Sequence, residues 1–348
     1  MVQTEESTTT WERMMAWRMP AEWEPHDRTW MAWPTSGPSL EDLDDGGVAQ
    51  VRGAWASVAN AVARFEPVTI VVDPADLGDV EQWLDEGIEI QVAPLDDCWM
   101  RDIGPTFVIG DGLGAVDWTF NGWGAQSWSR WEQDSKIGRV VGEAAGATVI
   151  DSAMVNEGGG IHVDGEGTVL VTETVQLDPG RNPTYDKAQV EAELRRTLGV
   201  EKVVWLPRGL TRDYETFGTR GHVDIVATFA GPDRILYHDQ RDPAHPDHEV
   251  TKAVVAALEA AGEWDLVPVA APVQLRDDEG WVDWSYINHL VVNGGVILCG
   301  FDDPSDEDAV AVLSEAYPER EVVLVDARPI FDRGGGIHCI TQQQPRVS

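Results

Sequence analysis

The sequence predicts an α/β fold in which five related units close into one pseudo-symmetric domain. A helical pattern followed by an apolar, β-rich stretch occurs five times, and these stretches begin near residues 88, 147, 202, 265 and 321. Successive starts are 55 to 63 residues apart, and such regular self-similarity is typical of repeat architectures. No glycine-rich dinucleotide-binding motif follows any of the strands, which disfavours a nucleotide-binding open sheet.

Within each unit, one sequence pattern predicts the helix and a different pattern predicts the strand. The helical stretches carry apolar residues three or four positions apart, as Val190, Leu194 and Leu198 do, which places them on one helix face. The strand stretches are nearly continuous runs of Val, Ile and Leu, the pattern expected where both faces of a sheet are covered. In chain order the predicted helix and strand of each unit are 79–86 with 88–94, 137–145 with 148–150, 190–198 with 202–207, 251–261 with 265–269, and 309–317 with 321–325.

Further strands and loops lie between the units. Apolar β-rich runs predict strands at 68–72, 168–172, 223–229 and 295–299, and surface loops are expected at 37–47 and 239–248. Five units of similar length favour a single domain at 11–348, preceded by a disordered tail at 1–10. An open parallel sheet with helices on both faces is the alternative architecture.

Charge and cysteine content exclude several classes of protein. The 348 residues include 61 Asp and Glu against 25 Lys and Arg, a formal net charge of −36. This field disfavours nucleic acid and anionic membranes as partners and attracts a small cation, although an acidic surface that only keeps the protein soluble is the simpler alternative. Three cysteines cannot all pair, which favours a reducing compartment. Residues 1–10 do not resemble a secretory signal, and no apolar run is long enough to span a membrane, so a cytoplasmic protein is expected.

Unusual polar residues follow the repeated strands. Their loops contain 96–102 after the first strand, 156–160 after the second, 221–224 after the third and 333–339 after the fifth. If the units are related by rotation, equivalent loops meet at one end of the axis. Two aspartates, Glu157, His222 and Cys339 would then lie in one pocket.

These residue types together suit one kind of chemistry. A thiolate is a strong nucleophile at neutral pH when its pKa is lowered, and a nearby histidine is its usual partner. His222 and Asp224 are two positions apart in an expected strand, so their side chains share a face. Carboxylates match the planar fork of a guanidinium. The set therefore favours attack of Cys339 on a guanidinium carbon over attack on a peptide bond, for which oxyanion donors would dominate.

Other candidate residues have simpler interpretations. Cys98 and Cys299 lie in apolar or aromatic surroundings and are expected to be buried, inert thiols. His338 should point away from Cys339 if that stretch is extended. Trp99 lies among acidic residues and could form the apolar wall of a cation site. Arg101 is expected to form a local ion pair with the adjacent Asp102.

A metal-dependent hydrolase is the chemical alternative. His162, His222, His338, Asp224 and Glu157 are all residue types that bind metals. They do not form any of the compact ligand motifs of known metal sites. The sequence therefore predicts a site without a metal.

Several longer stretches carry a family resemblance. They are 19–34 (MPAEWEPHDRTWMAWP), 99–107 (WMRDIGPTF), 157–168 (EGGGIHVDGEGT), 181–183 (RNP), 205–209 (WLPRG) and 334–345 (GGGIHCITQQQP). Together they resemble the agmatine deiminase family of the guanidine-modifying pentein superfamily, which is related to bacterial peptidylarginine deiminases. The resemblance covers nearly the whole chain and implies the pentein fold, a five-bladed α/β propeller.

The resemblance also implies a mechanism without metal or organic cofactor. Cys339 would attack the guanidinium carbon, and His222 would protonate the departing ammonia and later activate water. Asp102 and Asp224 would hold the guanidinium nitrogens, and Glu157 would orient the histidine. A covalent thiouronium intermediate would be hydrolysed to a ureido product, which for agmatine is N-carbamoylputrescine, a precursor of putrescine.

Further substrate contacts are implied at Asp96, Trp99 and Gly336. Around His222 the chain departs from agmatine-directed members, which carry an acidic stretch before the histidine and an asparagine after Asp224. Those positions here are Gly218, Arg220 and Ile225. Arg220 would repel a second cation or bind a carboxylate, unless it pairs with Asp213 or Glu215.

The substrate and the assembly stay open at this stage. Agmatine is the first expectation, with arginine, peptidyl arginine or a specialised guanidine metabolite as alternatives. A non-catalytic binding protein built on the same fold is the alternative from another functional class. The small guanidine is the expected partner, and a homo-oligomer is compatible with the sequence.

Overall fold

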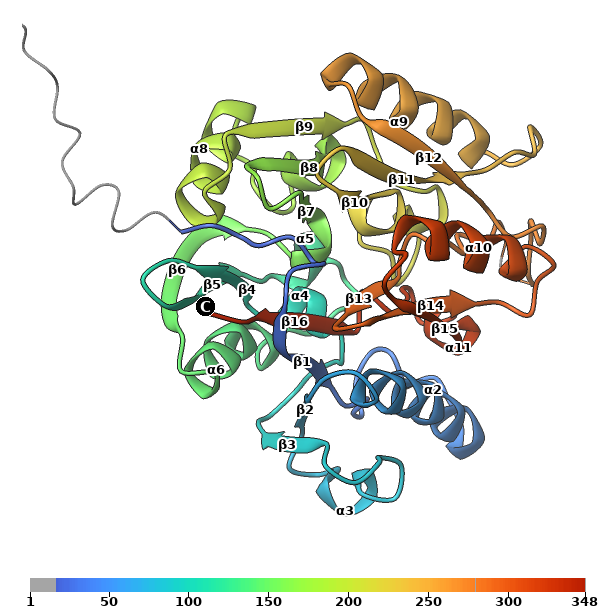
Figure 1. Cartoon of the computed structure of the whole chain (residues 1–348). Coiled ribbons are helices and arrows are strands. Elements are labelled where there is room, and N and C mark those ends of the chain that lie inside the picture. The colour runs from blue at the N-terminus through green and yellow to red at the C-terminus, as the bar shows by residue number, and fades with distance from the viewer. Residues whose placement is uncertain (1–16, 279, 348) are drawn as a thin grey trace, which may run out of the picture.

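Five small β-sheets follow one another around a central axis in the computed structural model, which describes residues 17–278 and 280–347 (Figure 1). The tail predicted at 1–10 lies outside the described residues. The single domain expected for 11–348 stays a prediction. The five sheets themselves confirm the predicted five-bladed α/β propeller, and the alternative of one open parallel sheet is wrong.

The first sheet has four strands and each of the others has three. The first contains, in spatial order, β16 (Thr341–Pro345), β1 (His26–Ala32), β2 (Val68–Val72) and β3 (Glu89–Val92). The next two are β4 (Thr106–Ile109), β5 (Leu113–Thr119) and β6 (Thr148–Val155), then β7 (Ile161–Val163), β8 (Thr168–Thr172) and β9 (Lys202–Leu206). The last two are β10 (Ala227–Gly231), β11 (Arg234–Asp239) and β12 (Asp265–Ala270), then β13 (Leu290–Val292), β14 (Gly295–Gly300) and β15 (Glu321–Asp326).

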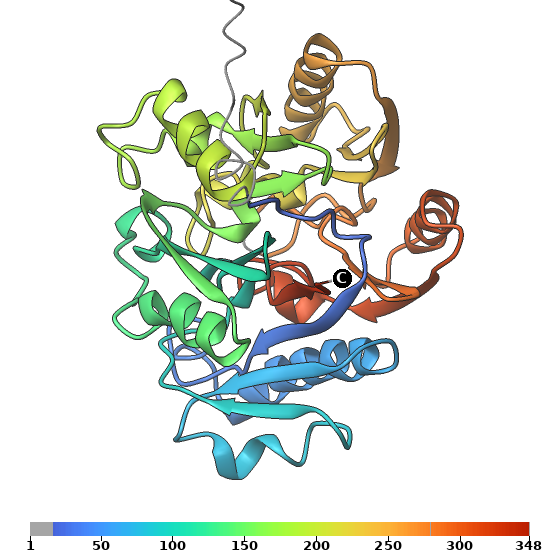
Figure 2. The same cartoon turned by 60° about the vertical axis from the view of Figure 1, so that its left-hand side comes forward.

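Each sheet combines an antiparallel pair of strands with a parallel pair. A helix joins parallel neighbours, as expected for parallel strands. These helices are α2 (Asp45–Ala63), α3 (Leu77–Val80), α6 (Ile137–Ala144), α8 (Lys187–Leu198), α9 (Asp247–Ala261) and α10 (Asp306–Ala316). They lie towards the outside of the ring in both views (Figures 1 and 2).

The ring closes where the two ends of the described chain meet. Strand β16 pairs antiparallel with β1, with Trp30 opposite Gln342. The Trp30 indole Nε1 donates a hydrogen bond to Gln344 Oε1 at 2.9 Å. The last strand therefore completes the first blade, next to the loop that carries Cys339.

Short helices and turns connect the blades. They are α4 (Met100–Ile103), α5 (Gly122–Ala125), α7 (Glu173–Gln176), α11 (Arg328–Phe331) and the 3₁₀ turns η1 (Asp134–Lys136), η2 (Gly158–Gly160), η3 (Arg212–Tyr214) and η4 (Val223–Ile225). Turn η2 contacts both α4 and η4. Among the helices of the described residues, none combines the length and apolar character needed to cross a bilayer.

Helix α8 shows how local sequence sets an element. The Asp186 side chain accepts from the Gln189 amide, and the Gln189 side chain accepts from the Asp186 amide, which forms a capping box. Val190, Leu194 and Leu198 are buried on one face, as predicted. Gly199 ends the helix with a φ of 70°, a conformation that glycine adopts without strain.

The predicted repeat is confirmed at all five strands, β3, β6, β9, β12 and β15, and at helices α6, α8, α9 and α10. The helix predicted at 79–86 is wrong, because α3 ends at Val80. Asn60 of helix α2 provides the physical reason. Its side chain donates to the Trp83 carbonyl and accepts from the Asp85 amide, replacing the hydrogen bonds that a longer helix would make.

Burial on both faces was expected of the repeated strands, and this expectation is wrong. Strands β3, β12 and β15 lie at the outer edges of their sheets and are partly exposed. The strands covered along their length are central ones such as β2 and β14. Their runs of Val and Ile are the ones that carry the core.

The strand predicted at 223–229 starts too early. Residues 223–225 form the turn η4, and β10 begins at Ala227. Side chains of another loop hold this turn, since Asn288 Nδ2 donates to the Asp224 carbonyl and Ser285 Oγ donates to the Ile225 carbonyl. Tertiary contacts therefore override a run of residues with high β-propensity.

The segment 37–47 is only partly the surface loop that the sequence predicts, since residues 41, 42 and 44 to 46 are exposed. Ser39 and its neighbours from 37 to 40 are buried, and helix α2, which the sequence analysis did not predict, begins at Asp45. Ser39 Oγ donates to Asp97 Oδ2 at 3.0 Å and accepts from Trp99 Nε1 at 3.1 Å. The segment therefore packs against the loop that leads to Asp102.

Candidate active site

The loops of the repeated units bring five predicted side chains together. Asp102 lies in α4, Glu157 directly precedes η2, and His222 and Asp224 lie at η4. Cys339 lies in the loop between α11 and β16. Each of these residues is at most 4% exposed. The cluster is thus a buried centre at one end of the ring, where the sequence analysis expected convergence.

His222 lies between two carboxylates. Its Nε2 is 3.2 Å from Glu157 Oε2, and its Nδ1 is 3.7 Å from Asp102 Oδ1. Glu157 in turn accepts from Arg181 Nε at 3.0 Å with both oxygens. The imidazole ring is therefore held in one orientation by a buried ion-pair chain.

The surrounding charges keep the histidine protonated. Burial disfavours the charged imidazole, but Asp102, Glu157 and Asp224 outweigh burial and raise the pKa of His222 to about 9. Burial also opposes ionisation of Glu157, yet Arg181 and His222 lower the pKa of Glu157 below its usual value. For Asp102, burial and the neighbouring carboxylates dominate and raise the pKa to about 6. At neutral pH the centre therefore holds an imidazolium beside carboxylates.

The Cys339 thiol is buried among polar groups. Asn288 Nδ2 donates to its Sγ at 3.2 Å, and Asp224 Oδ2 is 3.6 Å from the sulfur. Burial, followed by the charges of Asp224 and Asp102, raises the pKa of the Cys339 thiol well above its usual value. Without a bound cation the sulfur is therefore a neutral thiol.

Two polar atoms of the centre have no hydrogen-bond partner among the described residues, Asp224 Oδ1 and His222 Nδ1. His222 Nδ1 faces the space beside Gly159, and Asp224 borders that space with its other oxygen, Oδ2. A Cβ atom at Gly159 would lie 3.0 Å from both Asp102 Oδ1 and Asp224 Oδ2, and closer still to His222 Nδ1. Buried polar atoms without partners are rare, so this space suits a ligand with several N–H donors. Only glycine leaves room for it.

Trp99 and Gly336 border the thiol, but Asp96 does not. The edge of the Trp99 ring would be 2.7 Å from a Cβ at Gly335, whose own distance to Cys339 Sγ would be 3.1 Å. The Gly336 N–H faces the sulfur and stabilises its thiolate form. The half-buried Asp96 accepts from the Gln133 amide at 2.6 Å instead. Within the described residues it forms no hydrogen bond or ion pair with the clustered side chains.

The sequence analysis missed two residues that hold this centre. Asn288 lies in the loop after the fourth repeated strand, the one equivalent loop for which no candidate was named. The five-fold repeat could have indicated that position. Arg181 was only part of a family motif, and its contact with Glu157 bridges 24 residues of chain through tertiary structure.

His338 does not point away from the centre, so that expectation is wrong. Its Nδ1 is 2.7 Å from Asp224 Oδ2, and its Nε2 is 2.6 Å from Glu22 Oε1. The physical reason is that residues 332–340 form turns and β16 begins only at Thr341. The alternation of side chains along an extended strand therefore does not apply.

The two arginines also pair differently from the sequence predictions. Arg101 was expected to pair with Asp102, but its Nη1 donates to Gln343 and lies 3.5 Å from Glu22. Arg220 pairs with the buried Asp178 at 2.9 Å. It pairs with neither of the acidic neighbours proposed above, at 213 and 215.

Asp213 instead forms hydrogen bonds within the loop that carries His222. Its carboxylate accepts from the backbone amides of Thr219, Gly221 and His222 at 2.6 to 3.2 Å. These bonds fix the turn that presents the histidine. Asp213 therefore stabilises the conformation of the loop that carries His222.

The other cysteines are buried and uncharged, as expected. Burial raises the pKa of Cys98 well above its usual value and that of Cys299 to about 12. The Cys98 thiol donates to Asp97 Oδ1, and the Cys299 thiol donates to the Asn288 carbonyl. Neither sulfur has the environment of a nucleophile.

The metal ligands considered in the sequence analysis do not gather in one place. In the described part of the chain, the one group of suitable atoms within 4.8 Å of one another is Glu22, His162 and His338. His162 Nε2 is already hydrogen-bonded to Thr228 Oγ1 at 2.6 Å. The Arg101 guanidinium 3.5 Å from Glu22 disfavours a divalent cation there.

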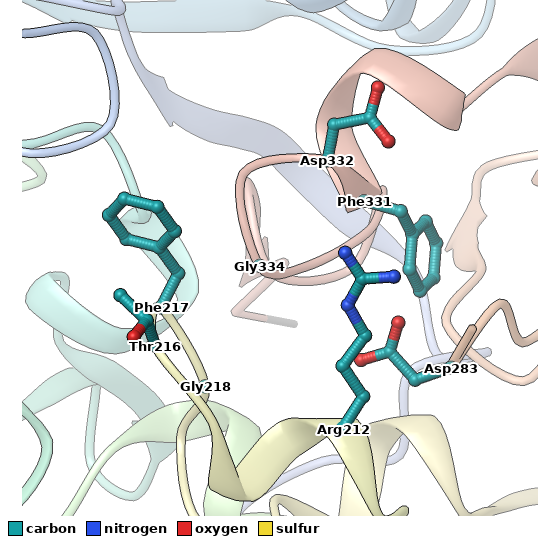
Figure 3. A pocket seen from close by; sticks show the side chains of 8 residues that line it. All are labelled: Arg212, Thr216, Phe217, Gly218, Asp283, Phe331, Asp332 and Gly334. Carbon is teal, nitrogen blue, oxygen red and sulfur yellow. The ribbon is translucent and has the colours of Figure 1, made fainter. Parts of the chain in front are cut away.

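A small pocket with a cavity volume of about 20 Å³ lies next to the loop that carries Cys339 (Figure 3). Its lining residues are Arg212, Thr216, Phe217, Gly218, Asp283, Phe331, Asp332 and Gly334. Figure 3 shows Arg212 and Asp283 on one side of the pocket and Phe217 on the other. Phe331 connects the pocket to the centre, since its ring would be 2.7 Å from a Cβ at Gly336.

The five-bladed ring and the cysteine–histidine–carboxylate centre define the pentein class of guanidine-modifying proteins. The chain belongs to the Porphyromonas-type peptidyl-arginine deiminase family, whose family model matches residues 18–345. It is 40% identical to the agmatine deiminase of Pseudomonas aeruginosa over 367 residues, with 97% of this chain and 98% of the relative covered. A Streptomyces avermitilis protein, named only provisionally as an agmatine deiminase, is 58% identical over 338 residues, covering 94% of this chain and 97% of that protein.

A solved structure supports the same family assignment. The agmatine deiminase of Enterococcus faecalis superposes with a TM-score of 0.87 at 32% identity, and 95% of this chain and 96% of that chain are covered. The pentein fold that the sequence predicted is thus confirmed by a relative as well as by the five sheets.

Proposed function

We propose that this protein is a hydrolase of amidine C–N bonds that converts agmatine and water to N-carbamoylputrescine and ammonia. The observation that carries the proposal is the buried cluster of one thiol, one imidazolium and carboxylates around the space beside Gly159. The named agmatine deiminases of Pseudomonas aeruginosa and Enterococcus faecalis support the choice of substrate.

Asp102 and Asp224 bind the guanidinium group. Their oxygens flank the space beside Gly159, and Asp224 Oδ1 is buried without a partner among the described residues. Carboxylates accept hydrogen bonds from the planar N–H fork of a guanidinium. This planar arrangement orients the central carbon of the substrate for attack from the side of Cys339.

The bound cation activates the thiol. Burial and then two carboxylates raise the pKa of Cys339, and a guanidinium between the carboxylates neutralises part of their charge. The imidazolium of His222 adds a second positive charge nearby. Thiolate formation is thereby coupled to the presence of substrate, which spares the free enzyme from oxidation and alkylation at Cys339.

The covalent half-reaction then requires one proton. When the cation binds, the Cys339 thiol releases its proton to solvent. The resulting thiolate forms a bond to the guanidinium carbon, and the bond from that carbon to one terminal nitrogen breaks. His222 donates its proton to the departing nitrogen, which leaves as ammonia. The products are neutral His222, held by Glu157, and a positively charged thiouronium on Cys339.

Hydrolysis restores the starting state. Neutral His222 accepts a proton from water, and the resulting hydroxide adds to the thiouronium carbon. The carbon–sulfur bond breaks, which releases the ureido product and the Cys339 thiol. His222 again carries the proton it needs for the next turnover, so the same residue acts as acid and then as base.

The aminobutyl end of agmatine is assigned to the pocket in Figure 3. The pocket adjoins the centre through Phe331 and contains the carboxylates of Asp283 and Asp332. Its one cation, Arg212, is paired with Asp277. Arg220 does not line this pocket and pairs with Asp178, so it is not assigned a substrate contact.

The test measures ammonia release from agmatine, arginine, an arginyl peptide and guanidinobutyrate, with and without EDTA. Agmatine should be the preferred substrate, and EDTA should have no effect. The Cys339→Ser variant should release no ammonia, whereas Cys98→Ser should retain activity because its thiol is buried away from the centre. Mass spectrometry of the native enzyme, quenched with acid during turnover of agmatine, should show an adduct on Cys339. Appreciable turnover by Cys339→Ser, or an adduct on another cysteine, would refute the mechanism.

Two alternatives predict other results in the same assay. A deiminase for arginine or peptidyl arginine would prefer a carboxylate-bearing or peptide guanidine over agmatine. A non-catalytic binding protein would release no ammonia from any member of the panel.

A further inference from the structure

A second buried network holds the side chain of Asp224. His338 bridges two carboxylates, with Nδ1 2.7 Å from Asp224 Oδ2 and Nε2 2.6 Å from Glu22 Oε1. The three side chains are at most 6% exposed. The mechanism proposed above uses Asp224 but neither of the other two residues.

The network is tied to the nucleophile loop from several directions. Arg101 Nε donates to the His338 carbonyl at 3.2 Å, and the Arg101 amide donates to the Cys339 carbonyl at 3.0 Å. Gln343 Nε2 donates to Glu22 Oε1 at 3.4 Å. Glu22 follows the first described residues of the chain, whereas Gln343 lies in the last strand. The network therefore joins the two ends of the described chain behind the active centre.

Charge explains why a histidine stands between two acids. A buried carboxylate without a partner is strongly disfavoured, and Asp224 must stay ionised to bind a cation. For His338, burial and Arg101 oppose protonation, but Glu22 and Asp224 outweigh them and raise its pKa. Burial likewise opposes ionisation of Asp224, and the hydrogen bond from His338 leads the contributions that lower its pKa.

The hydrogen bond from His338 acts on the Asp224 oxygen that borders the substrate space. Oδ2 accepts from His338, would lie 3.0 Å from a Cβ at Gly159, and is 3.6 Å from Cys339 Sγ. Oδ1 has no partner among the described residues. A carboxylate held at one oxygen by a fixed donor cannot rotate freely, so the orientation of Asp224 beside the substrate space is fixed.

We propose that His338, itself held by Glu22, is a positioning residue that fixes the orientation of the Asp224 carboxylate beside the guanidinium. This inference rests on the proposed function of Asp224 as a guanidinium ligand. His338 does not touch the substrate in this arrangement, and its effect passes through Asp224. Glu22 acts one step further back, by holding the His338 ring in place.

The test measures agmatine binding by calorimetry in the Cys339→Ser background, where no turnover disturbs the equilibrium. His338→Gln removes the donor to Asp224 and should weaken binding roughly 10- to 100-fold, as expected for loss of a charge-assisted hydrogen bond. His338→Asn places an amide N–H near the position of Nδ1 and should recover most of the affinity. Glu22→Gln should weaken binding alone, but add little to His338→Gln, because both act through one contact.

The matched control is His245→Gln. His245 is equally buried and lies 3.6 Å from Asp247 in another part of the ring. Its variant should bind agmatine as the parent does. In the enzyme with Cys339 intact, His338→Gln should raise KM more than it lowers kcat.

A structural role alone would give another pattern. Equal loss of affinity in His338→Asn and His338→Gln, additive effects of the His338 and Glu22 changes, or an equal loss in His245→Gln would overturn the inference. A metal ion found stoichiometrically at Glu22 and His338 would also overturn it.

The two proposals fail in different ways. If the enzyme with its native cysteine releases no ammonia from agmatine, the proposed substrate is wrong. The positioning role is then measured as the affinity for guanidinium chloride, at non-denaturing concentrations, in the Cys339→Ser background. Weaker binding in His338→Gln and its recovery in His338→Asn would still support the inference, and equal affinity in both would refute it.

Discussion

Removing the charge of Glu157 should move the alkaline limit of activity. His222 must carry a proton to release ammonia, and Glu157 is one of the carboxylates that raise its pKa from 6.5 to about 9. In Glu157→Gln the side chain still accepts from Arg181 Nε, and Arg181 keeps its partner Asp178 at 2.9 Å. The substitution thus removes one negative charge beside the imidazole while most of the buried network stays satisfied.

The size of the effect follows from the pKa of His222. A rise from 6.5 to about 9 corresponds to about 3 kcal/mol in favour of the imidazolium. Asp102 and Asp224 remain in the variant, so only part of this stabilisation is lost. Loss of one opposite charge at this distance lowers a pKa by about 1 to 2 pH units. The alkaline limb of the kcat/KM profile should therefore fall to lower pH by that amount.

The assay is ammonia release between pH 6 and 10, at substrate concentrations well below KM. Stability provides an independent reading of the same pKa. A raised histidine pKa stabilises the fold below pH 6.5 and the contribution disappears as pH rises through about 9. Denaturant unfolding should therefore show the native protein losing more stability than Glu157→Gln across this interval.

Glu66→Gln is the matched control for this prediction. Glu66 is buried and lies 3.2 Å from His26, which reproduces the glutamate–histidine pair outside the centre. Its variant should keep the alkaline limb of the parent. An unshifted limb in Glu157→Gln, or an equal shift in Glu66→Gln, would refute the assignment of the limb to His222.

Three further predictions concern space, charge and specificity. Gly159→Ala should lower kcat/KM at least about 100-fold, because its Cβ would occupy the space between Asp102 and Asp224. Gly112 has open space around it, so Gly112→Ala should leave kcat/KM unchanged. Arg220→Gln should leave the ratio of kcat/KM for agmatine and arginine unchanged, because Arg220 pairs with Asp178 outside the pocket; a changed ratio would place it in the substrate path. Burial and then Asp213 raise the pKa of Asp283 to about 7, so KM for agmatine should fall as pH rises from 6 to 8, and Asp283→Asn should abolish that fall.

The sequence predicted the repeat because each unit repeats the same local signals. Helix α8 carries its own cap and its own apolar face, and both can be read without knowing the fold. Helix α3 shows the opposite case, since Asn60 of another helix takes the hydrogen bonds that the predicted helix would have made. Local periodicity is reliable where the element is stabilised mainly by its own residues.

The five central residues could be proposed from sequence for a different reason. Cys339, His222 and the three carboxylates follow strands at equivalent places in a rotational repeat, and rotation brings such places together. The structure places these residues in one buried cluster. Their individual roles stay predictions until the variants above are measured.

The supporting residues could not be found in that way. His338 reaches Asp224 only because the loop before β16 turns instead of extending. Arg181 reaches Glu157 from a later part of the chain, and the carboxylate that neutralises Arg220 is Asp178, far from the expected neighbours. Each contact depends on how separate loops pack, and no spacing in the sequence encodes it.

The two networks around the centre stabilise two different charged groups. Arg181 and Glu157 hold the proton on His222, and Glu22 and His338 keep the charge on Asp224. Neither network touches the sulfur of Cys339, which burial and Asp224 keep protonated. The missing positive charge is the one that a guanidinium brings, so the substrate itself completes the set of charges that makes the thiol a nucleophile. A neutral isostere of the guanidinium would fill the same space without activating the sulfur, and selectivity for cations thus follows from the chemistry as much as from the fit.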